Sequence, residues 1–198
     1  MITIYLVRHG QKLPHAGDPG LTKIGLRQAK ETGEYLKQFP ITKIISSPHK
    51  RTVEIAQQIT QVLNLKHSLH NALIERMNWE DQGITRQEFI QEWITATNDR
   101  EYIPKYGDSS LATGQRIHQL VTEISKDSDH VVLVTHGGAI LDYLRNIFGD
   151  EQMAVLRTQY DEGEDFRMMN CAINKVVFSD VPSLELLNFI DHLTDTSE

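Results

Sequence analysis

The stretch His130-Val131-Val132-Leu133-Val134-Thr135-His136-Gly137-Gly138 indicates the fold class of this protein. Its apolar run, Val131–Val134, is typical of a strand that is buried on both faces of a parallel sheet. Gly137 and Gly138 then begin a segment with apolar residues at helical spacing, which we expect to end at Gly149. A buried strand that leads directly into a helix is the repeating unit of an α/β fold.

The same order of strand and helix occurs twice nearer the N-terminus. Residues 2–7 alternate and are rich in β-branched side chains, and Thr22 follows as the predicted N-cap of a helix. Residues 43–45 form a second predicted strand, after which Ser47 and Pro48 are the expected N-cap and first residue of another helix. The expected apolar faces contain Leu26, Ala29, Tyr35 and Leu36 in the first helix and Val53, Ala56, Ile59, Val62 and Leu63 in the second.

The remaining sequence adds shorter strands and more helices. Thr85 and Glu88 have the spacing of a capping box before Phe89, Ile90, Trp93 and Ile94. Strands are expected near residues 67–69, 172–178 and 184–190, and a helix is expected around Ile117, Leu120, Val121 and Ile124. We therefore predict a three-layer α/β fold with a mostly parallel central sheet flanked by helices. Residues 1–198 show no repeat or linker and are expected to form one domain, in which residues 74–112 form a helical lid.

Composition and charge restrict the function. The chain has 20 Lys and Arg residues against 27 Asp and Glu residues, a net charge of −7, which argues against a general nucleic-acid or anionic-membrane binder. The single cysteine, Cys171, is expected to be a small buried residue, since it has no partner for an internal disulfide or a cysteine-pair metal site. The N-terminus runs straight into a strand, and no apolar run reaches the ~20 residues of a membrane span, so we expect a cytoplasmic protein.

Basic residues and histidines gather at three predicted junctions between a strand and a helix. Arg8 and His9 follow the first strand, Arg51 lies shortly after the second, and His136 follows the central strand. The carboxyl ends of parallel strands meet at the edge where open α/β sheets bind ligands. We expect these four side chains to lie together there. Six of the other seven histidines are expected to be structural, namely His49, His67, His70, His118, His130 and His192.

Arg51 indicates the charge of the ligand. It falls in the first turn of its predicted helix, where the helix dipole disfavours a cation. With an anion bound at that helix end, Arg51 becomes favourable there, because the backbone N–H groups, the helix dipole and the guanidinium all attract the anion. Two arginines and two histidines suit phosphate best. Two histidines also allow a metal site, but metals favour carboxylate ligands and two nearby arginines repel a cation, so we predict no metal.

Several motifs occur in a fixed order along nearly the whole chain. They are Leu6-Val7-Arg8-His9-Gly10, Asp18-Pro19-Gly20-Leu21-Thr22, Ser46-Ser47-Pro48 leading to Arg51-Thr52, Leu73-Ile74-Glu75, Val134-Thr135-His136-Gly137-Gly138, and a C-terminal segment from Asn188 to Leu193. This ordered set resembles the histidine phosphatase superfamily, the phosphoglycerate-mutase-like enzymes.

The resemblance implies phosphoryl transfer through a phosphohistidine. By position, His9 is the nucleophile, and Arg8, Arg51 and His136 surround the transferred phosphoryl group. Glu75 protonates the leaving oxygen and then activates the water that hydrolyses the phosphohistidine. No metal or other cofactor is required, because the arginines and histidines take the part of the cation.

This sequence departs from the family pattern around the expected mouth of the site. Gln11 and Lys12 follow Gly10 where relatives commonly have Glu and then Thr, Ser or Asn, and His15 stands where many have Asn. With Gly137, Gln11 and His15 are the candidate substrate-mouth residues. The segment after the acid, residues 76–81, is shorter than usual, so Glu80 and Asp81 stay open as alternatives to Glu75. The departures affect the substrate more than the chemistry.

We therefore predict a metal-independent phosphomonoesterase that acts on a small phosphorylated metabolite. A phosphoglycerate-type mutase is the first alternative, although the family's mutases are longer and have insertions that this chain lacks. A non-catalytic, phosphate-dependent regulatory module is the second alternative. We expect neither nucleic acid nor membrane as a partner, and leave homodimerisation open. The aromatic residues of the expected lid are predicted either to shape the substrate site or to pack the lid: Trp79, Phe89, Trp93, Tyr102 and Tyr106.

Overall fold

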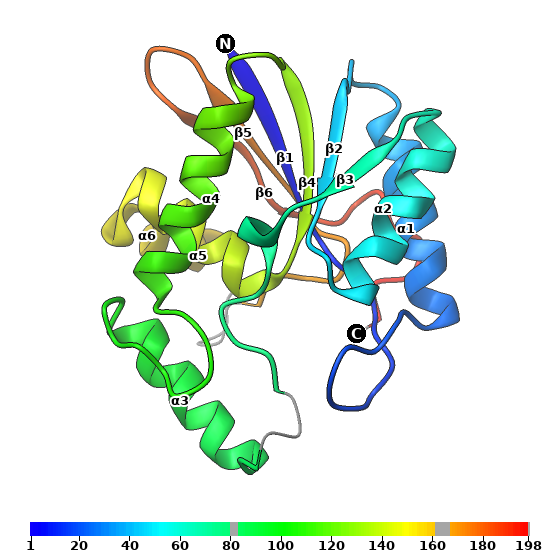
Figure 1. The fold of residues 1–198 in the computed structure, drawn as a ribbon. Coiled ribbons are helices and arrows are strands. Elements are labelled where there is room, and N and C mark those ends of the chain that lie inside the picture. Colours follow the sequence, from blue (N-terminus) through cyan, green and yellow to red (C-terminus); the bar gives the residue numbers. More distant parts are fainter. Residues whose placement is uncertain (80–82, 161–166, 198) are drawn as a thin grey trace.

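The computed structural model describes residues 1–79, 83–160 and 167–197 (Figure 1). Its central sheet has six strands in the order β3-β2-β4-β1-β5-β6. The strands are β1 (Ile2–Arg8), β2 (Lys43–Ser46), β3 (His67–Leu69), β4 (His130–Thr135), β5 (Ile173–Phe178) and β6 (Ser183–Phe189). The pairs β3-β2, β2-β4 and β4-β1 are parallel, whereas β1-β5 and β5-β6 are antiparallel. The prediction of a mostly parallel sheet is confirmed.

Helices cover both faces of the sheet. They are α1 (Lys23–Leu36), α2 (Lys50–Leu63), α3 (Arg86–Asn98), α4 (Ser110–Ile124), α5 (Gly137–Phe148) and α6 (Asp150–Tyr160). Figure 1 shows α1 and α2 on one side of the strands and α4, α5 and α6 on the other. Alternate residues of β1 enter the two cores, since Leu6 packs with the residues of α4 and α5 and Val7 with those of α1 and α2. This arrangement confirms the three-layer α/β prediction.

Several local predictions are confirmed. Thr22 caps α1 by accepting a hydrogen bond from the Gly25 N–H, and Thr85 and Glu88 form the predicted capping box of α3. Gly149 ends α5 with a φ of 81°, a left-handed value that glycine adopts without strain. The helix α6 is an element that the sequence pattern did not predict, because its apolar residues show only weak helical periodicity.

Other local predictions are wrong. The N-cap of α2 is His49 rather than Ser47, and the helix begins at Lys50, so Pro48 lies outside it. The Ser47 hydroxyl contacts His136 instead of capping the helix, and the Thr52 hydroxyl donates to the Ser47 carbonyl. The buried face of α2 contains Ile55 instead of Val53. In α1, Leu26 is exposed, and the buried face is made by Gly25, Gln28, Ala29, Thr32, Gly33 and Leu36.

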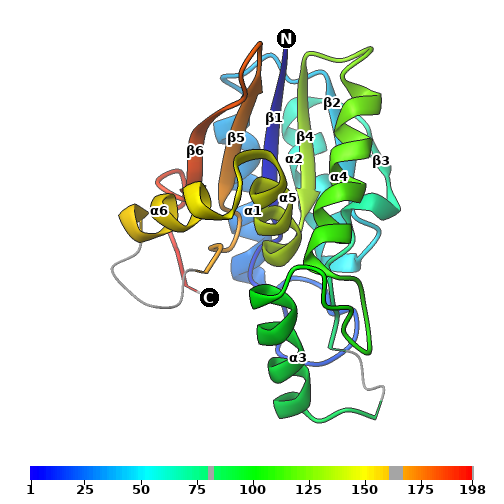
Figure 2. The same cartoon turned by 90° about the vertical axis from the view of Figure 1, so that its left-hand side faces the viewer.

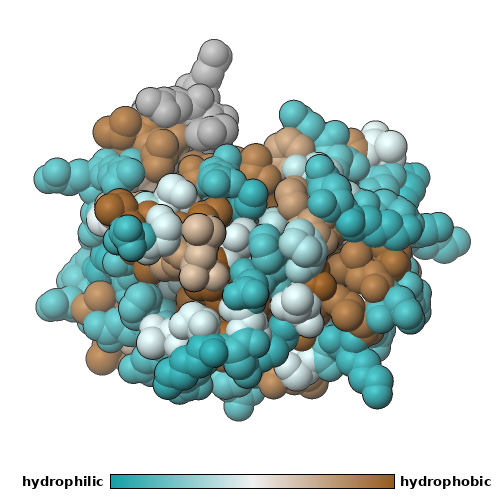
Figure 3. Space-filling view, turned by 90° about the horizontal axis from the view of Figure 1, so that it is seen from above, coloured by the Kyte–Doolittle hydropathy of each residue, from teal (hydrophilic) through white to brown (hydrophobic). Residues whose placement is uncertain are grey.

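Figure 2 shows α3 beyond the carboxyl ends of β1 and β4, below the layer of strands. Of the α3 residues only Ala96 is fully buried, so this helix is not part of either sheet core. At the opposite end of the molecule, the face seen from above in Figure 3 is largely hydrophilic, with smaller hydrophobic patches between. Within the described ranges, the structure contains no helix of the length and hydropathy required to cross a membrane.

Candidate active site

Three neighbouring strands bring the predicted site residues together. The strands β2, β4 and β1 are adjacent and parallel, with Ser46 opposite Val134 and Thr135 opposite Arg8. The residues that follow these positions therefore meet at one edge of the sheet. His9 and His136 lie there with their ring centroids 5.5 Å apart.

His9 is held in one orientation. Its ring is buried, and Nδ1 lies 2.9 Å from the carbonyl oxygen of Gly10, to which it donates. A neutral imidazole carries one proton, so this hydrogen bond leaves Nε2 unprotonated. Burial, and then the positive charges of Arg8 and Arg51, hold the pKa of His9 well below its ordinary value. The site therefore contains an oriented, neutral imidazole beside two arginines.

Arg51 connects three parts of the site. Its buried guanidinium donates to Asn78 Oδ1 at 2.8 Å and to His136 Nδ1 at 3.1 Å, and pairs with Asp18 at 3.5 Å. Arg8 reaches the same region from β1 and donates to the carbonyl oxygen of Met168. Burial, and then the charge of Arg51, also lower the pKa of His136 well below its ordinary value. The two arginines therefore place positive charge directly beside His9.

His49 and Asn78 are site residues that were not predicted from the sequence. His49 Nδ1 lies 3.3 Å from both Ser47 Oγ and His136 Nε2, and His49 Nε2 accepts from Asn78 Nδ2 at 2.6 Å. His136 Nε2 is also 2.9 Å from Ser47 Oγ. His49 was predicted to be merely structural. Its position between Ser47 and Arg51, at the N-terminus of α2, was the available signal that it belongs to the site.

Glu75 lies against the N-terminus of α5. Its carboxylate accepts hydrogen bonds from the backbone N–H groups of Gly138 at 3.1 Å, Ala139 at 2.8 Å and Arg76 at 2.9 Å. Arg116 holds the preceding backbone by donating to the carbonyl oxygen of Ile74 at 2.8 Å. The carboxylate is consequently fixed over the start of α5.

One large cavity of about 800 Å³ joins these groups to α3. Its wall contains Arg8, His9, Arg51, Glu75 and Gly137, which places five of the predicted site residues around one space. The α3 residues in the wall are Arg86, Phe89, Ile90, Trp93, Ile94, Thr97 and Asn98. His136 lies behind this surface, in contact with Arg51.

Two predicted mouth residues do not line the cavity. The side chain of Gln11 accepts a hydrogen bond from the Thr22 hydroxyl at 2.6 Å, at the start of α1. His15 is exposed, with Nδ1 3.3 Å from the carbonyl oxygen of Ala16. Gly137 is therefore the one of the three mouth candidates that contacts the cavity. The alternative acids Glu80 and Asp81 lie outside the described residues.

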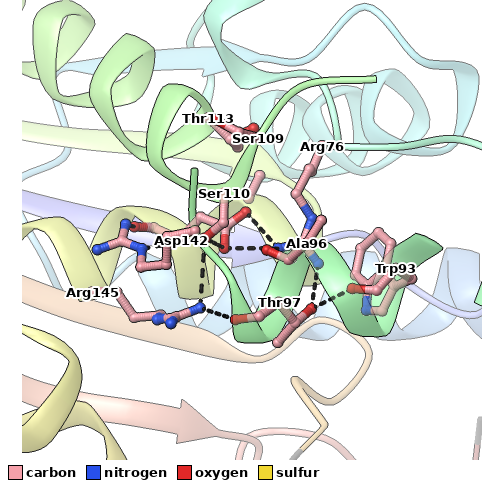
Figure 4. A network of polar contacts seen from close by, with 12 residues as sticks. Arg76, Trp93, Ala96, Thr97, Ser109, Ser110, Thr113, Asp142 and Arg145 are labelled. Carbon is pink, nitrogen blue, oxygen red and sulfur yellow. Dashed lines mark hydrogen bonds and ion pairs between the residues drawn. The ribbon is translucent and has the colours of Figure 1, made fainter. Parts of the chain in front are cut away.

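A buried ion pair forms part of the cavity wall, and its network of polar contacts is drawn in Figure 4. Arg76 Nη1 lies 3.1 Å from Asp142 Oδ1, and both side chains are almost completely buried. Arg76 also donates to the Thr97 hydroxyl of α3 at 2.7 Å, while Asp142 accepts from the Ser110 hydroxyl of α4 at 2.6 Å. These contacts join α3, α4 and α5 to the segment that contains Glu75.

The charged groups at this site are suited to an anion. Arginine forks and neutral imidazoles recognise phosphate oxygens, whereas nearby guanidinium groups repel a metal ion. Among the residues that the structure describes, no group of three or more His, Cys, Asp or Glu side chains is placed to hold a metal ion. Cys171 is buried, and burial raises the pKa of its thiol to about 12, so it is protonated at neutral pH.

Solved structures share this fold. A mycobacterial glucosyl-3-phosphoglycerate phosphatase determined with inorganic phosphate has a TM-score of 0.79 and 21% identity, covering 98% of this chain and 100% of its own. A phosphoserine phosphatase mutant from Entamoeba histolytica, in complex with phosphoserine, has a TM-score of 0.70 and 22% identity, with coverage of 98% and 100%. Neighbours with different named substrates therefore have this architecture.

Curated relatives match over nearly the whole chain. A protein named "probable phosphoglycerate mutase" from Proteus mirabilis is 27% identical over 98% of this chain and 96% of its own length. Chain length therefore does not separate this protein from relatives that are named mutases, contrary to the length argument made from the sequence. The family model described as histidine phosphatase superfamily (branch 1) matches residues 4–188. The chain belongs to the histidine phosphatase superfamily.

Proposed function

We propose that this protein is a metal-independent phosphomonoesterase that hydrolyses a small phosphorylated metabolite through a phosphohistidine on His9. Family membership supports an enzyme that acts on phosphate esters. The observation that carries the proposal is the state of His9, whose Nδ1–H is bound to Gly10 beside Arg8 and Arg51. That arrangement leaves Nε2 with the free lone pair that a nucleophile needs.

In the first half of the reaction, His9 Nε2 attacks phosphorus while the bond from phosphorus to the ester oxygen breaks. Arg8 and Arg51 stabilise the charge on the phosphoryl oxygens, with Arg51 positioned by Asn78 and His136. Glu75 gives a proton to the departing oxygen, so the alcohol leaves uncharged. The products of this half are the free alcohol, a phosphohistidine and a deprotonated Glu75.

In the second half, Glu75 takes a proton from water as the water oxygen attacks phosphorus. The bond between phosphorus and His9 Nε2 breaks, and the imidazole returns to its neutral form. Three backbone N–H groups hold the Glu75 carboxyl group in position for this transfer. One water is consumed, and inorganic phosphate is released.

We further propose that residues 1–198 act as one domain and that residues 74–112 cover the reacting phosphate as a lid. In support, this segment supplies Glu75, Arg76 and α3, all of which contribute to the cavity wall. A cover of this kind keeps bulk water away from the phosphohistidine until the alcohol has left.

A mutase is the competing function, and the names of the curated relatives favour it. In a mutase, the phosphohistidine passes its phosphoryl group back to a bound sugar acid rather than to water. The same His9, Arg8 and Arg51 serve both reactions, so the outcome depends on what occupies the cavity beside Glu75. Direct assay separates the two.

The experiment is phosphate release from p-nitrophenyl phosphate in the presence of EDTA. We expect turnover by the wild type and its loss in His9→Ala. His118→Ala is the matched control, because His118 is exposed on α4 and lies outside the cavity wall, and it is expected to retain activity. Loss of activity in EDTA contradicts the metal-independent mechanism. Phosphoglycerate interconversion that requires a bisphosphate primer, without net hydrolysis, supports the mutase instead.

A further inference from the structure

We propose that the substrate's leaving group is a bulky apolar group, preferably aromatic, which packs against Trp93 and Phe89 of α3. This inference rests on the proposed function, in which Glu75 protonates the leaving oxygen. It assigns α3 as the part of the chain that selects the substrate.

The apolar side of α3 faces the cavity instead of the protein core. Phe89, Ile90, Trp93 and Ile94 all line the cavity, and Ile90 and Ile94 remain 44% and 46% exposed. Covering apolar surface of this kind releases water and is favourable. A ligand with a complementary apolar group gains that free energy on binding, whereas a small polar ligand does not.

Trp93 lies directly beside the proposed acid. A Cβ atom placed on Gly138 lies 2.5 Å from the Trp93 ring at Cη2 and 2.8 Å from Glu75 Oε1. The indole edge and the carboxylate therefore approach the same point above the start of α5. The oxygen that Glu75 protonates is bonded to the leaving group, so that group emerges next to Trp93.

The Trp93 ring packs against a partner that is itself held in place. The guanidinium of Arg76 lies 4.3 Å from the centre of the indole ring and is itself fixed by the Asp142 carboxylate. Phe89 extends the wall along α3, with its ring centroid 6.1 Å from that of Trp93 and the planes tilted by 34°. A preorganised aromatic surface binds a flat group with little loss of side-chain freedom.

Cavity size supports a large leaving group. At about 800 Å³ the space is near the upper end of the ~300–1,000 Å³ range of small-molecule sites. A three-carbon acid occupies a small part of it. Lys12, Arg86 and Arg167 also line the cavity, so a leaving group with a second anionic group is the competing class. Phosphoglycerate represents that class in the experiment.

The experiment compares phenethyl phosphate with ethyl phosphate, two esters whose alkoxide leaving groups have similar basicity, and includes phosphoglycerate as the anionic competitor. We expect kcat/KM to be about 10- to 100-fold higher for phenethyl phosphate than for ethyl phosphate. A ratio below about threefold, or a preference for phosphoglycerate over phenethyl phosphate, overturns the inference while leaving a phosphatase in place.

Trp93→Ala is expected to reduce this ratio to within about threefold of one, because the wall that contacts the phenyl ring is gone. Gln91→Ala is the matched control, since Gln91 is exposed on the same helix and lies outside the cavity wall, and it is expected to keep the wild-type ratio. A ratio that persists in Trp93→Ala overturns the inference.

Binding of phosphonates to the wild type tests the inference without turnover and without a variant. Phenethylphosphonate is expected to bind about tenfold or more tightly than ethylphosphonate, measured by calorimetry. If no phosphate ester is hydrolysed, the proposed function fails, and this comparison still decides the inference. Equal affinities for the two phosphonates overturn it.

Discussion

Arg51 Nη2 lies 3.1 Å from His136 Nδ1 and determines which nitrogen of that ring carries the proton. A guanidinium only donates, so Nδ1 is the acceptor and the proton resides on Nε2, toward Ser47 Oγ. Arg51 also donates to Asn78 Oδ1, which turns the Asn78 amide N–H toward His49 Nε2. One arginine therefore sets the tautomers of two histidines, and His49 presents its Nδ1–H to Ser47.

From this network we predict that His49 positions His136. His49→Leu removes the acceptor for Asn78 and a donor to Ser47, and is expected to lower kcat/KM by about tenfold, equivalent to ~1.4 kcal/mol. His49→Gln is the conservative control. It keeps an acceptor and a donor and is expected to stay within about threefold of the wild type. Equal losses in the two variants, or no loss in His49→Leu, contradict the positioning role.

The low pKa values of His9 and His136 lead to a second prediction. Both rings are expected to be neutral at pH 6, below the ordinary histidine pKa of ~6.5, because burial and the arginines disfavour the charged form. Nitrogen NMR of the imidazole rings measures this state directly. Rings that titrate near pH ~6.5 contradict the lowered pKa values of these two histidines.

The same two histidines affect stability. Their folded-state pKa values lie below those of the unfolded chain, so the unfolded state takes up protons first as the pH falls. Their contribution to the free energy of unfolding is fully present above the unfolded pKa of ~6.5 and is lost progressively as the pH falls from there to the lower folded-state pKa values. Urea denaturation of His9→Phe against the wild type, at several pH values, is expected to show a weaker acid destabilisation in the variant.

Glu75→Gln tests the proton donor. An alkyl phosphate needs its leaving oxygen protonated, so kcat/KM is expected to fall by about 10²–10⁴-fold in this variant. For p-nitrophenyl phosphate the decrease is expected to be much smaller, since nitrophenolate leaves without a proton. Glu80→Gln and Asp81→Asn are the controls for the alternative acids. If one of these controls shows the leaving-group dependence and Glu75→Gln does not, the proton donor is misassigned.

The buried pair of Arg76 and Asp142 is predicted to be a stability determinant. Arg76→Met leaves a buried carboxylate without its cation and is expected to cost ~3–5 kcal/mol of unfolding free energy at pH 7. Burial already raises the pKa of Asp142 to about 6, opposed by Arg76, so removing Arg76 raises it further. The carboxyl then binds a proton more tightly in the folded state than in the unfolded chain.

The pH dependence of this loss has a definite sign. In Arg76→Met the folded-state pKa of Asp142 exceeds the unfolded value of ~3.9, so stability decreases as the pH rises from ~4 through the folded pKa. The variant is expected to recover part of its loss at pH ~5 relative to pH ~7. Arg76→Met/Asp142→Asn lacks the titrating group and is expected to show no such recovery. Identical pH profiles of the two variants contradict this explanation.

Much of the fold was predictable because the local pattern of apolar residues agrees with the environment that each segment has in the folded protein. The apolar run Val131–Val134 has one stable environment, between helices on both faces, and the structure places it next to β1 and β2 at the centre of the sheet. Arg8 ends β1, and His9 and His136 directly follow β1 and β4. Parallel strands bring residues at such positions to one edge of the sheet, whatever the conformation of the loops. Glu75 was located only by the family resemblance, because it follows no long strand.

What the sequence did not predict depends on contacts between distant segments. The Ser47-Pro48 pair has good local capping chemistry, but Ser47 Oγ contacts His136 and the helix begins three residues later, at Lys50. His49 joins the site through contacts with His136, which is 87 residues away, and Asn78, which is 29 residues away. The Gln11 side chain, predicted to lie at the mouth of the site, accepts a hydrogen bond from the Thr22 hydroxyl at the start of α1. None of these partners is visible in local periodicity.

The most direct test is to identify the atom that carries the transferred phosphoryl group. Brief incubation with a labelled phosphate monoester, followed by alkaline quench and peptide mapping, is expected to place an acid-labile, base-stable label on His9. The label is expected to be absent in His9→Ala. A label on Ser47, or an active enzyme with no label on His9, contradicts catalysis through a phosphohistidine.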